Sequence, residues 1–209
     1  QSRSSAASDV YKRQPSTYVP LNATLGFKAS PVNGLWFNIF GGYRISKDEL
    51  FCNLVDADGY YFTHFLQDKA KTAYGGAELK YGYKDWFDAS LKGTFYSWKT
   101  DNENEELYLM TKPKFELNFY AEAKVFEGLK VYLGYEYVQR KEYVIEEGNS
   151  SRDFGLGNIS NLSVGASYTF LKDLSVFGRV NNLLNKQYYY EYGYPAEKLN
   201  VLAGLSLVF

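Results

Sequence analysis

The stretch Lys114–Val125, KFELNFYAEAKV, decides the fold class. Its odd-numbered positions are all apolar, whereas its even-numbered positions are charged or polar. Successive side chains of a β-strand point to opposite faces, so a strand that borders one apolar environment alternates with a period of two. The stretch therefore predicts a strand with one wholly apolar face and one polar face.

The same period continues on both sides of this stretch, and no segment has a convincing helical period. Predicted strands of about 10–12 residues are longer than the usual strand of about 5–6 residues in soluble proteins. The sequence therefore predicts an all-β chain, an antiparallel up-and-down meander of about nine long strands. The other eight predicted strands are 21–30, 35–44, 73–83, 87–96, 130–137, 162–170, 175–182 and 198–209.

The predicted connections alternate between two lengths. Four are tight and rich in turn-forming Gly, Pro, Asn or Asp: 31–34, 83–86, 127–129 and 171–174. Four are long and polar: 47–72, 100–111, 144–160 and 186–197. This alternation places every tight turn at one end of the sheet and every long connection at the other. Transmembrane β-barrels of the bacterial outer membrane have this asymmetry.

Composition agrees with a membrane barrel and excludes several other classes of protein. Aromatic residues make up 19% of the chain, and many of them lie near predicted strand ends, as the aromatic girdles of such barrels do. No run of about 18 apolar residues could form a transmembrane helix, but a spanning strand needs only about 9–11 residues. The net charge of −1 gives no basic face for nucleic acid.

The sequence predicts no catalytic residue, metal site or cofactor. One Cys and one His exclude an internal disulfide and a His/Cys metal cluster. The Asp56–Gly59 segment lacks the remaining acidic ligands of a calcium loop, and no Ser or Cys nucleophile motif surrounds His64. The chain is therefore not expected to be an enzyme.

Two faces of the meander have different predicted roles. In a barrel the apolar face meets lipid and the polar face lines the lumen, whereas a soluble carbohydrate-binding β-sandwich would bury the apolar face in its core. The aromatic cluster in the longest connection could contact a ligand such as a sugar ring; its members are Tyr60, Tyr61, Phe62, His64 and Phe65. The charged residues predicted to face the lumen are Lys28, Arg44, Lys80, Lys92, Glu116, Glu122, Lys124 and Arg179.

The two ends of the chain differ in kind. Residues 1–14 read as translated adaptor sequence or as a disordered polar segment, so the barrel segment is expected to be 15–209. Bacterial single-chain barrels have an even number of strands, so nine strands predict that further strands precede them and that this segment alone forms an open curved sheet. By strand parity, the last strand ends with Phe209 at the tight-turn end, where a terminal aromatic residue would be read by the barrel-assembly machinery.

The last thirty residues resemble the C-terminus of TonB-dependent outer-membrane receptors, particularly a group from Bacteroidetes. The elements that carry this resemblance are Asn182-Leu183-Leu184-Asn185-Lys186-Gln187-Tyr188, then Gly193-Tyr194-Pro195, and a final alternating strand to Phe209. Ala196-Glu197-Lys198 replaces the Gly-Arg pair that often precedes the last strand of these receptors. The segments Phe40–Asp48 and Gly76–Trp98 are also similar to that group.

The resemblance implies an outer-membrane receptor of a Gram-negative bacterium that binds a small molecule or glycan at its outer loops and imports it. Coupling to TonB would require a plug and a TonB box in regions before this chain. A passive porin, or a structural or adhesive outer-membrane protein without TonB coupling, is the first alternative. The soluble carbohydrate-binding β-sandwich is the second.

Overall fold

The computed structural model describes residues 17–54, 62–101, 108–141, 144–147, 150–153, 156–171, 174–191 and 194–208. Nine strands form one antiparallel sheet in the order β1-β2-β3-β4-β5-β6-β9-β10-β13, and two short hairpins lie outside it. The prediction of a nine-stranded antiparallel meander is therefore confirmed. The sheet strands are β1 (Tyr18–Val32), β2 (Leu35–Leu54), β3 (Phe62–Tyr83), β4 (Phe87–Thr100), β5 (Pro113–Phe126), β6 (Leu129–Arg140), β9 (Ile159–Leu171), β10 (Leu174–Asn181) and β13 (Asn200–Leu207).

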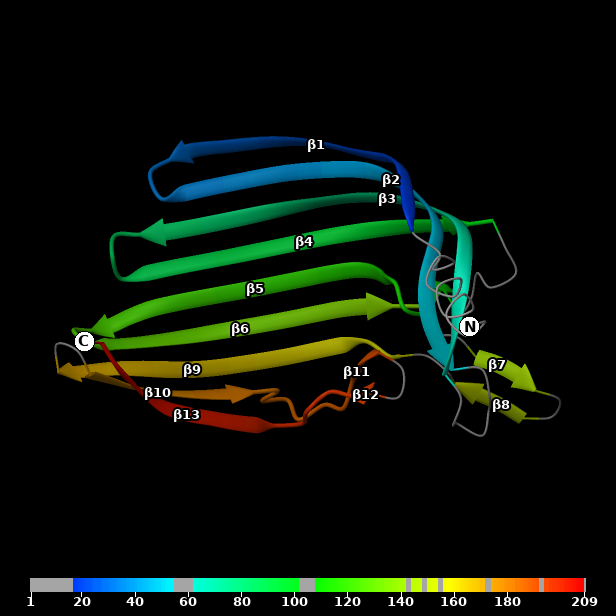
Figure 1. The fold of residues 1–209 in the computed structure, drawn as a ribbon. Helices are drawn as coiled ribbons and strands as arrows, with labels where there is room; N and C mark the ends of the chain where they lie inside the picture. Colours follow the sequence, from blue (N-terminus) through cyan, green and yellow to red (C-terminus); the bar gives the residue numbers. More distant parts are fainter. Residues whose placement is uncertain are drawn as a thin grey trace, which may run out of the picture.

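The sheet is a single curved layer with two open edges, β1 and β13 (Figure 1). Among the described residues no second sheet covers either of its faces. A β-sandwich requires two sheets packed face to face, so the described structure does not support the soluble alternative. An open curved sheet is the form expected of one part of a barrel wall.

The cross-strand register separates the side chains into two faces. Directly opposed residues share a face, and one continuous row runs Lys28–Asn38–Glu78–Lys92–Asn118–Glu136 across six strands. We call the face of this row the polar face. Residues one position away form the apolar face, which is uncovered: Leu25 is 84% exposed and Leu205 is 71% exposed. Such a large exposed apolar surface indicates contact with lipid or with another protein.

The tight turns lie at one end of the sheet, together with the end of the last strand (Figure 1). Turns between β1 and β2, between β3 and β4, and between β5 and β6 occupy the predicted positions. Lys172 and Asp173 of the fourth turn lie outside the described residues.

Each described tight turn is hydrogen-bonded to the strand that follows its hairpin in the sheet. The amide of Gly82 donates to the Gly34 carbonyl at 2.8 Å, that of Lys124 to Trp86 at 2.7 Å, and that of Thr169 to Gly128 at 2.9 Å. Gly34 and Gly128 have positive φ angles of 83° and 85°, which glycine adopts without the steric cost of a Cβ atom.

The long connections contain more strand structure than predicted. The segment expected as a loop, 47–72, is mostly an extension of β2 and β3, which pair continuously from Lys47↔Lys69 to Leu54↔Phe62. The connection 144–160 contains a hairpin of β7 (Val144–Glu147) and β8 (Ser150–Asp153), and the connection 186–197 contains β11 (Tyr189–Glu191) and β12 (Tyr194–Pro195). Backbone pairing satisfies peptide groups that a loop would leave to water.

Buried side chains gather at the long-connection end, whereas the middle of the sheet is a single exposed layer. Tyr108 and Ala70 are 0% and 1% exposed and pack with Trp98 and Leu109. A second cluster joins Val138, Ile159 and Tyr188, with Ala196 packed against it. The described core of the chain therefore lies around the rim and not between two layers.

Candidate functional site

The extension of β2 and β3 bends over the long-connection end of the sheet (Figure 1). We call the segment 47–54 with 62–69 the rim hairpin. β1 pairs with β2 only as far as Tyr18↔Lys47, and β4 pairs with β3 only as far as Thr100↔Ala70. Beyond those residues neither β1 nor β4 pairs with the hairpin. Asp48, with a φ of 54°, directly follows Lys47, the last residue of β2 that pairs with β1.

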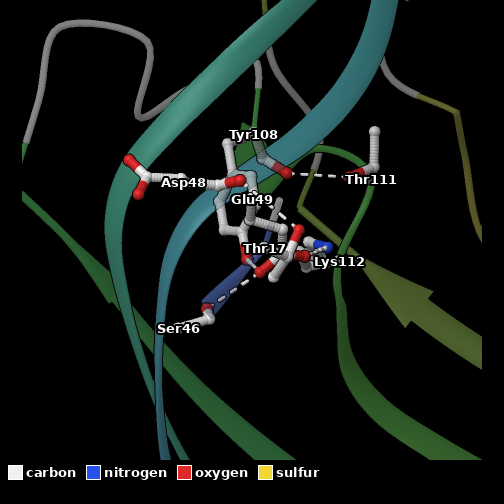
Figure 2. Close-up of polar contacts among 7 residues, drawn as sticks. All are labelled: Thr17, Ser46, Asp48, Glu49, Tyr108, Thr111 and Lys112. Carbon is white, nitrogen blue, oxygen red and sulfur yellow. Dashed lines mark hydrogen bonds and ion pairs between the residues drawn. The ribbon is translucent and has the colours of Figure 1, made fainter. Parts of the chain in front are cut away.

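Glu49 attaches the rim hairpin to the connection between β4 and β5 (Figure 2). Its carboxylate accepts hydrogen bonds from Ser46 Oγ at 2.9 Å, from Tyr108 OH at 3.0 Å and from Lys112 Nζ at 2.8 Å. The Lys112 contact is also an ion pair between two largely shielded side chains, 21% and 22% exposed. Charge-assisted hydrogen bonds of this kind are roughly twice as strong as neutral ones.

The chain from Tyr108 to Lys112 forms a compact turn that presents these donors. Thr111 Oγ1 donates to the Tyr108 carbonyl at 2.8 Å, and the Lys112 amide donates to the Leu109 carbonyl at 3.1 Å. The Lys112 ammonium group also lies 4.4 Å from the centre of the Tyr108 ring, a cation–π distance. The turn is therefore built to hold a lysine and a tyrosine against Glu49.

The environment fixes the protonation states of this cluster. Burial by itself would raise the pKa of Glu49, but the hydrogen bond and charge of Lys112, with the Ser46 and Tyr108 hydroxyls, hold that pKa below its ordinary value of 4.5. Burial and the neighbouring Glu49 carboxylate raise the pKa of Tyr108 far above its ordinary value. Glu49 is therefore ionised and Tyr108 is a neutral donor at neutral pH.

Glu49→Gln is expected to loosen the rim hairpin. The amide keeps the size of the carboxylate but loses its charge, so the Lys112 ion pair disappears, and amide hydrogen exchange in 47–54 should become faster. Acid should act in the same way: because the folded-state pKa is lowered, the stabilisation is complete above pH 4.5 and is lost as the pH falls through the folded-state pKa. Hydrogen exchange measured by mass spectrometry against pH checks both results.

Asp101→Asn is the matched control for this experiment. Asp101 is 53% exposed and lies 3.9 Å and 3.8 Å from the ammonium groups of Lys69 and Lys71. Exposed pairs of this kind contribute little to stability. Equal acceleration in both variants would mean that Glu49 does not hold the hairpin.

A second rim attachment centres on Asn182, at the end of β10. Asn182 is 1% exposed, and its side-chain amide donates to the carbonyls of Lys186 at 2.7 Å and Glu197 at 3.1 Å. The Asn182 amide oxygen in turn accepts from the Lys186 backbone at 3.2 Å. The Asn-Leu-Leu-Asn-Lys element that the sequence singled out is therefore a structural connector between β10 and β13.

The connection after this element returns to the polar face. Tyr190 OH donates to Glu136 Oε2 at 3.1 Å, so β11 is linked to β6 across the sheet. Burial and the nearby Glu136 carboxylate raise the pKa of Tyr190. Two connections, one before β5 and one before β13, therefore fold inward at the same rim.

The eight charged residues that the sequence assigned to a lumen all lie on the polar face by strand register. Lys28, Arg44, Lys80 and Lys92 come from β1 to β4, and the other four from β5 and β10. That this face lines a lumen stays a prediction at this point. The eight residues do not form one cluster, because they are spread over six strands, β1 to β5 and β10.

Several of these charged groups have polar or aromatic partners in place. Glu122 accepts from Lys130 Nζ and from Tyr120 OH, both at 2.9 Å, and Glu116 accepts from Tyr96 OH at 2.9 Å. Cation–π contacts join Lys80 to Trp36, Lys92 to Phe40 and Arg179 to Tyr132. Lys28, Arg44 and Lys124 make no ion pair with any other side chain that the structure describes. The polar face is therefore hydrophilic and carries charges of both signs, so it does not strongly favour either anions or cations.

The remaining predicted residues are placed only in part. Phe62, His64 and Phe65 belong to β3 and pair with β2 by register. They are therefore strand residues, and the prediction that they lie in a loop was wrong. Tyr60, Tyr61, Phe209 and residues 1–14 lie outside the described residues, and their predicted roles remain predictions. In the described part of the chain no group of His, Cys, Asp or Glu is arranged to hold a metal ion. No helix in that part is long and apolar enough to cross a membrane.

The sequence did not reveal the rim cluster. Glu49 lies 59 and 63 residues away from Tyr108 and Lys112 along the chain. The sequence signal was that Glu49 and Tyr108 lie within long polar connections between predicted strands, with Lys112 directly after the second of them, and such connections commonly carry functional residues. Nothing in a single sequence pairs one connection with another.

No family model matches the sequence, and no curated protein matches it. Several solved structures are similar to the chain. The pyoverdine outer-membrane receptor FpvA of Pseudomonas aeruginosa is 16% identical with a TM-score of 0.66, over 90% of this chain and 29% of the receptor. The ferric enterobactin receptor PfeA of the same organism is 16% identical with a TM-score of 0.64, over 92% and 31%. The siderophore receptor PirA, also from Pseudomonas aeruginosa, has a TM-score of 0.58 at 16% identity, over 90% and 29%.

These neighbours are TonB-dependent outer-membrane receptors and not enzymes. At 16% identity the likeness establishes the fold. The chain spans less than a third of the length of each receptor. The nine-stranded sheet thus has the fold of one part of such a receptor.

Proposed function

We propose that this chain is part of the barrel wall of a TonB-dependent receptor in the outer membrane of a Gram-negative bacterium. The apolar face meets outer-membrane lipid, and the polar face lines a lumen through which a bound solute passes. The solute, a small molecule or a glycan, binds at the long-connection end. TonB and the barrel-assembly machinery are its protein partners, and both act through regions that the structure does not describe.

One observation carries this proposal: a single layer of long strands with an uncovered apolar face and a mixed-charge polar face. A spanning structure must pair all of its backbone groups internally and present apolar side chains to lipid. The nine strands do both, except at the two open edges that further strands would pair. The likeness to FpvA and PfeA supports the receptor reading over other barrels.

The rim attachments favour a gated receptor over a passive porin. Glu49 ties the connection before β5 to the rim hairpin, and the Tyr190–Glu136 hydrogen bond ties the connection before β13 to β6, at the end that a solute would enter. A porin needs an unobstructed path at this end, whereas a receptor needs ordered side chains there to bind its ligand.

Ion conductance of the complete protein distinguishes these functions. In planar lipid bilayers containing KCl, the receptor reading predicts no steady conductance from the full-length protein. Cells that express it should accumulate ferric enterobactin or ferripyoverdine, the ligands of the solved neighbours, only while the proton gradient is intact. A steady open-channel conductance, with uptake that a protonophore does not reduce, would establish the porin alternative instead.

A further inference from the structure

The connection from β10 to β13 folds over the polar face of β6 and β9. We call its described residues, 186–191 with 194–197, the strap. Tyr188 of the strap is 5% exposed and packs with Val138 of β6 and Ile159 of β9. Val138 and Ile159 are directly opposed to each other and lie on the polar face by strand register. The strap therefore covers two apolar residues at the rim of the polar face.

The base of the strap is a single buried amide. The Asn182 side chain donates to the carbonyl of Lys186, the first residue of the strap, and to the carbonyl of Glu197, the last. Its oxygen accepts from the Lys186 backbone amide. Both donors and the acceptor of a side chain that is 1% exposed are therefore satisfied, and breaking these bonds would leave buried polar groups unpaired. The base is a fixed point.

The tip of the strap is attached to β6 by a less complete set of contacts. Arg140 Nη1 donates to the Tyr189 carbonyl, and Tyr190 OH donates to Glu136 Oε2 at 3.1 Å. Arg140 is only 9% exposed, and it forms no ion pair with any residue that the structure describes. Its buried Nε atom has no hydrogen-bond partner. A buried charge is costly unless it is paired and hydrogen-bonded, so the tip, unlike the base, holds a charged group that is only partly compensated.

Glu116 of β5 is an alternative partner for Arg140. It is directly opposed to Val138, which makes it a diagonal neighbour of Arg140 on the polar face. Diagonal neighbours lie about 7–8 Å apart, within reach of long side chains. Glu116 accepts a hydrogen bond from Tyr96 OH at 2.9 Å and forms no ion pair in the described part of the chain. Burial lowers the pKa of Arg140, and the charge of Glu116 is among those that oppose this effect.

We propose that the strap is a hinged segment with a closed and an open position, in which Arg140 exchanges the Tyr189 carbonyl for the Glu116 carboxylate. The base stays bound to Asn182, while the tip leaves β6 and uncovers the two apolar residues beneath it. The exchange gives the guanidinium an opposite charge and so offsets the apolar packing that the tip gives up. That this movement regulates access of a solute to the polar face rests on the proposed function, whereas the movement itself does not.

Cysteine accessibility in the folded full-length protein in detergent measures the open fraction. Ile159→Cys in a Cys52→Ser background places a thiol beneath the strap, at a position that is 1% exposed. Its rate of reaction with a water-soluble maleimide follows the open fraction when the strap moves faster than the thiol reacts. Glu116→Gln should slow the reaction about tenfold, the factor for one charge-assisted contact. Tyr190→Phe should accelerate it by a similar factor, because the closed position loses its bond to Glu136.

Glu122→Gln is the matched control for Glu116→Gln. Glu122 lies on the same strand and the same face, and it also accepts a tyrosine hydroxyl at 2.9 Å, that of Tyr120. It lies six residues farther along β5, towards the tight-turn end and away from the strap. The thiol beneath the strap should react in this variant at the rate of the parent protein.

Two results would overturn the inference. An unchanged rate in Glu116→Gln would remove the exchange of partners, and equal slowing in Glu116→Gln and Glu122→Gln would indicate a general effect of charge on the reaction. Heat-modifiable gel mobility must first show that each variant is folded, and Val138→Cys replaces Ile159→Cys as the reporter if that variant is not. Failure of the proposed function is recognised separately, from the conductance and uptake measurements, because the labelling rates do not depend on transport.

Discussion

Leu91→Arg is expected to prevent insertion of the full-length protein into the outer membrane. Leu91 is 41% exposed near the middle of β4, and its register neighbours on the apolar face are Leu79 and Phe119. An arginine on the lipid face of a membrane barrel costs roughly 2–4 kcal/mol at the bilayer midplane. Membrane fractionation with heat-modifiable gel mobility should show a strong loss of folded, membrane-bound protein.

Ser90→Arg is the control one residue away. Ser90 points to the polar face, where its register neighbours are Lys80 and Tyr120. An arginine there enters the proposed aqueous lumen, so insertion should remain close to that of the wild type. A variant pair in which Ser90→Arg blocks insertion and Leu91→Arg does not would reverse the assignment of the two faces.

Gly128→Ala is expected to destabilise the sheet more than its size suggests. A Cβ atom at this position would lie 2.4 Å from the Thr169 carbonyl oxygen, which belongs to the backbone and cannot rotate away. The positive φ adds a cost of about 1–2 kcal/mol for a residue with a side chain, and overpacking adds roughly 1–3 kcal/mol. Urea unfolding of the full-length protein in detergent should show a clear fall in the midpoint.

Gly157→Ala separates the two terms. Gly157 also has a positive φ, of 66°, but a Cβ atom there would meet nothing within 4 Å. This variant should show the backbone cost alone. If both variants lower the midpoint equally, the contact between Gly128 and Thr169 is not what constrains the turn.

Most of the sheet could be predicted from the sequence because each strand separates lipid-like and water-like surroundings. The strand β5 spans the stretch KFELNFYAEAKV almost residue for residue, since one of its faces is wholly apolar. The turn at Gly34 could also be predicted, because a backbone position with a positive φ favours glycine over other residues. Where physical constraint acts on every second residue, a single sequence records it.

The structure of the rim could not be predicted, because it does not depend on the alternation of apolar and polar residues that marks the strands of the sheet. Beyond Lys47 neither β1 nor β4 pairs with the hairpin, which no longer separates two environments. Leu50–Leu54 therefore has no period of two, and the sequence predicts a loop there. The cluster around Glu49 depends on residues from another connection. These features arise from the meeting of distant segments, which local pattern does not encode.

The bonds from the tight turns have a consequence for assembly. Each turn carbonyl is satisfied by an amide from the first strand of the next hairpin: Gly34 by β3, Trp86 by β5 and Gly128 by β9. A hairpin is therefore finished only when its successor has docked, and we expect hairpins to lock in serial order with neighbour-to-neighbour cooperativity. Each hairpin that docks would complete the turn of the hairpin before it, and its own turn carbonyl would stay unpaired until the next hairpin docks.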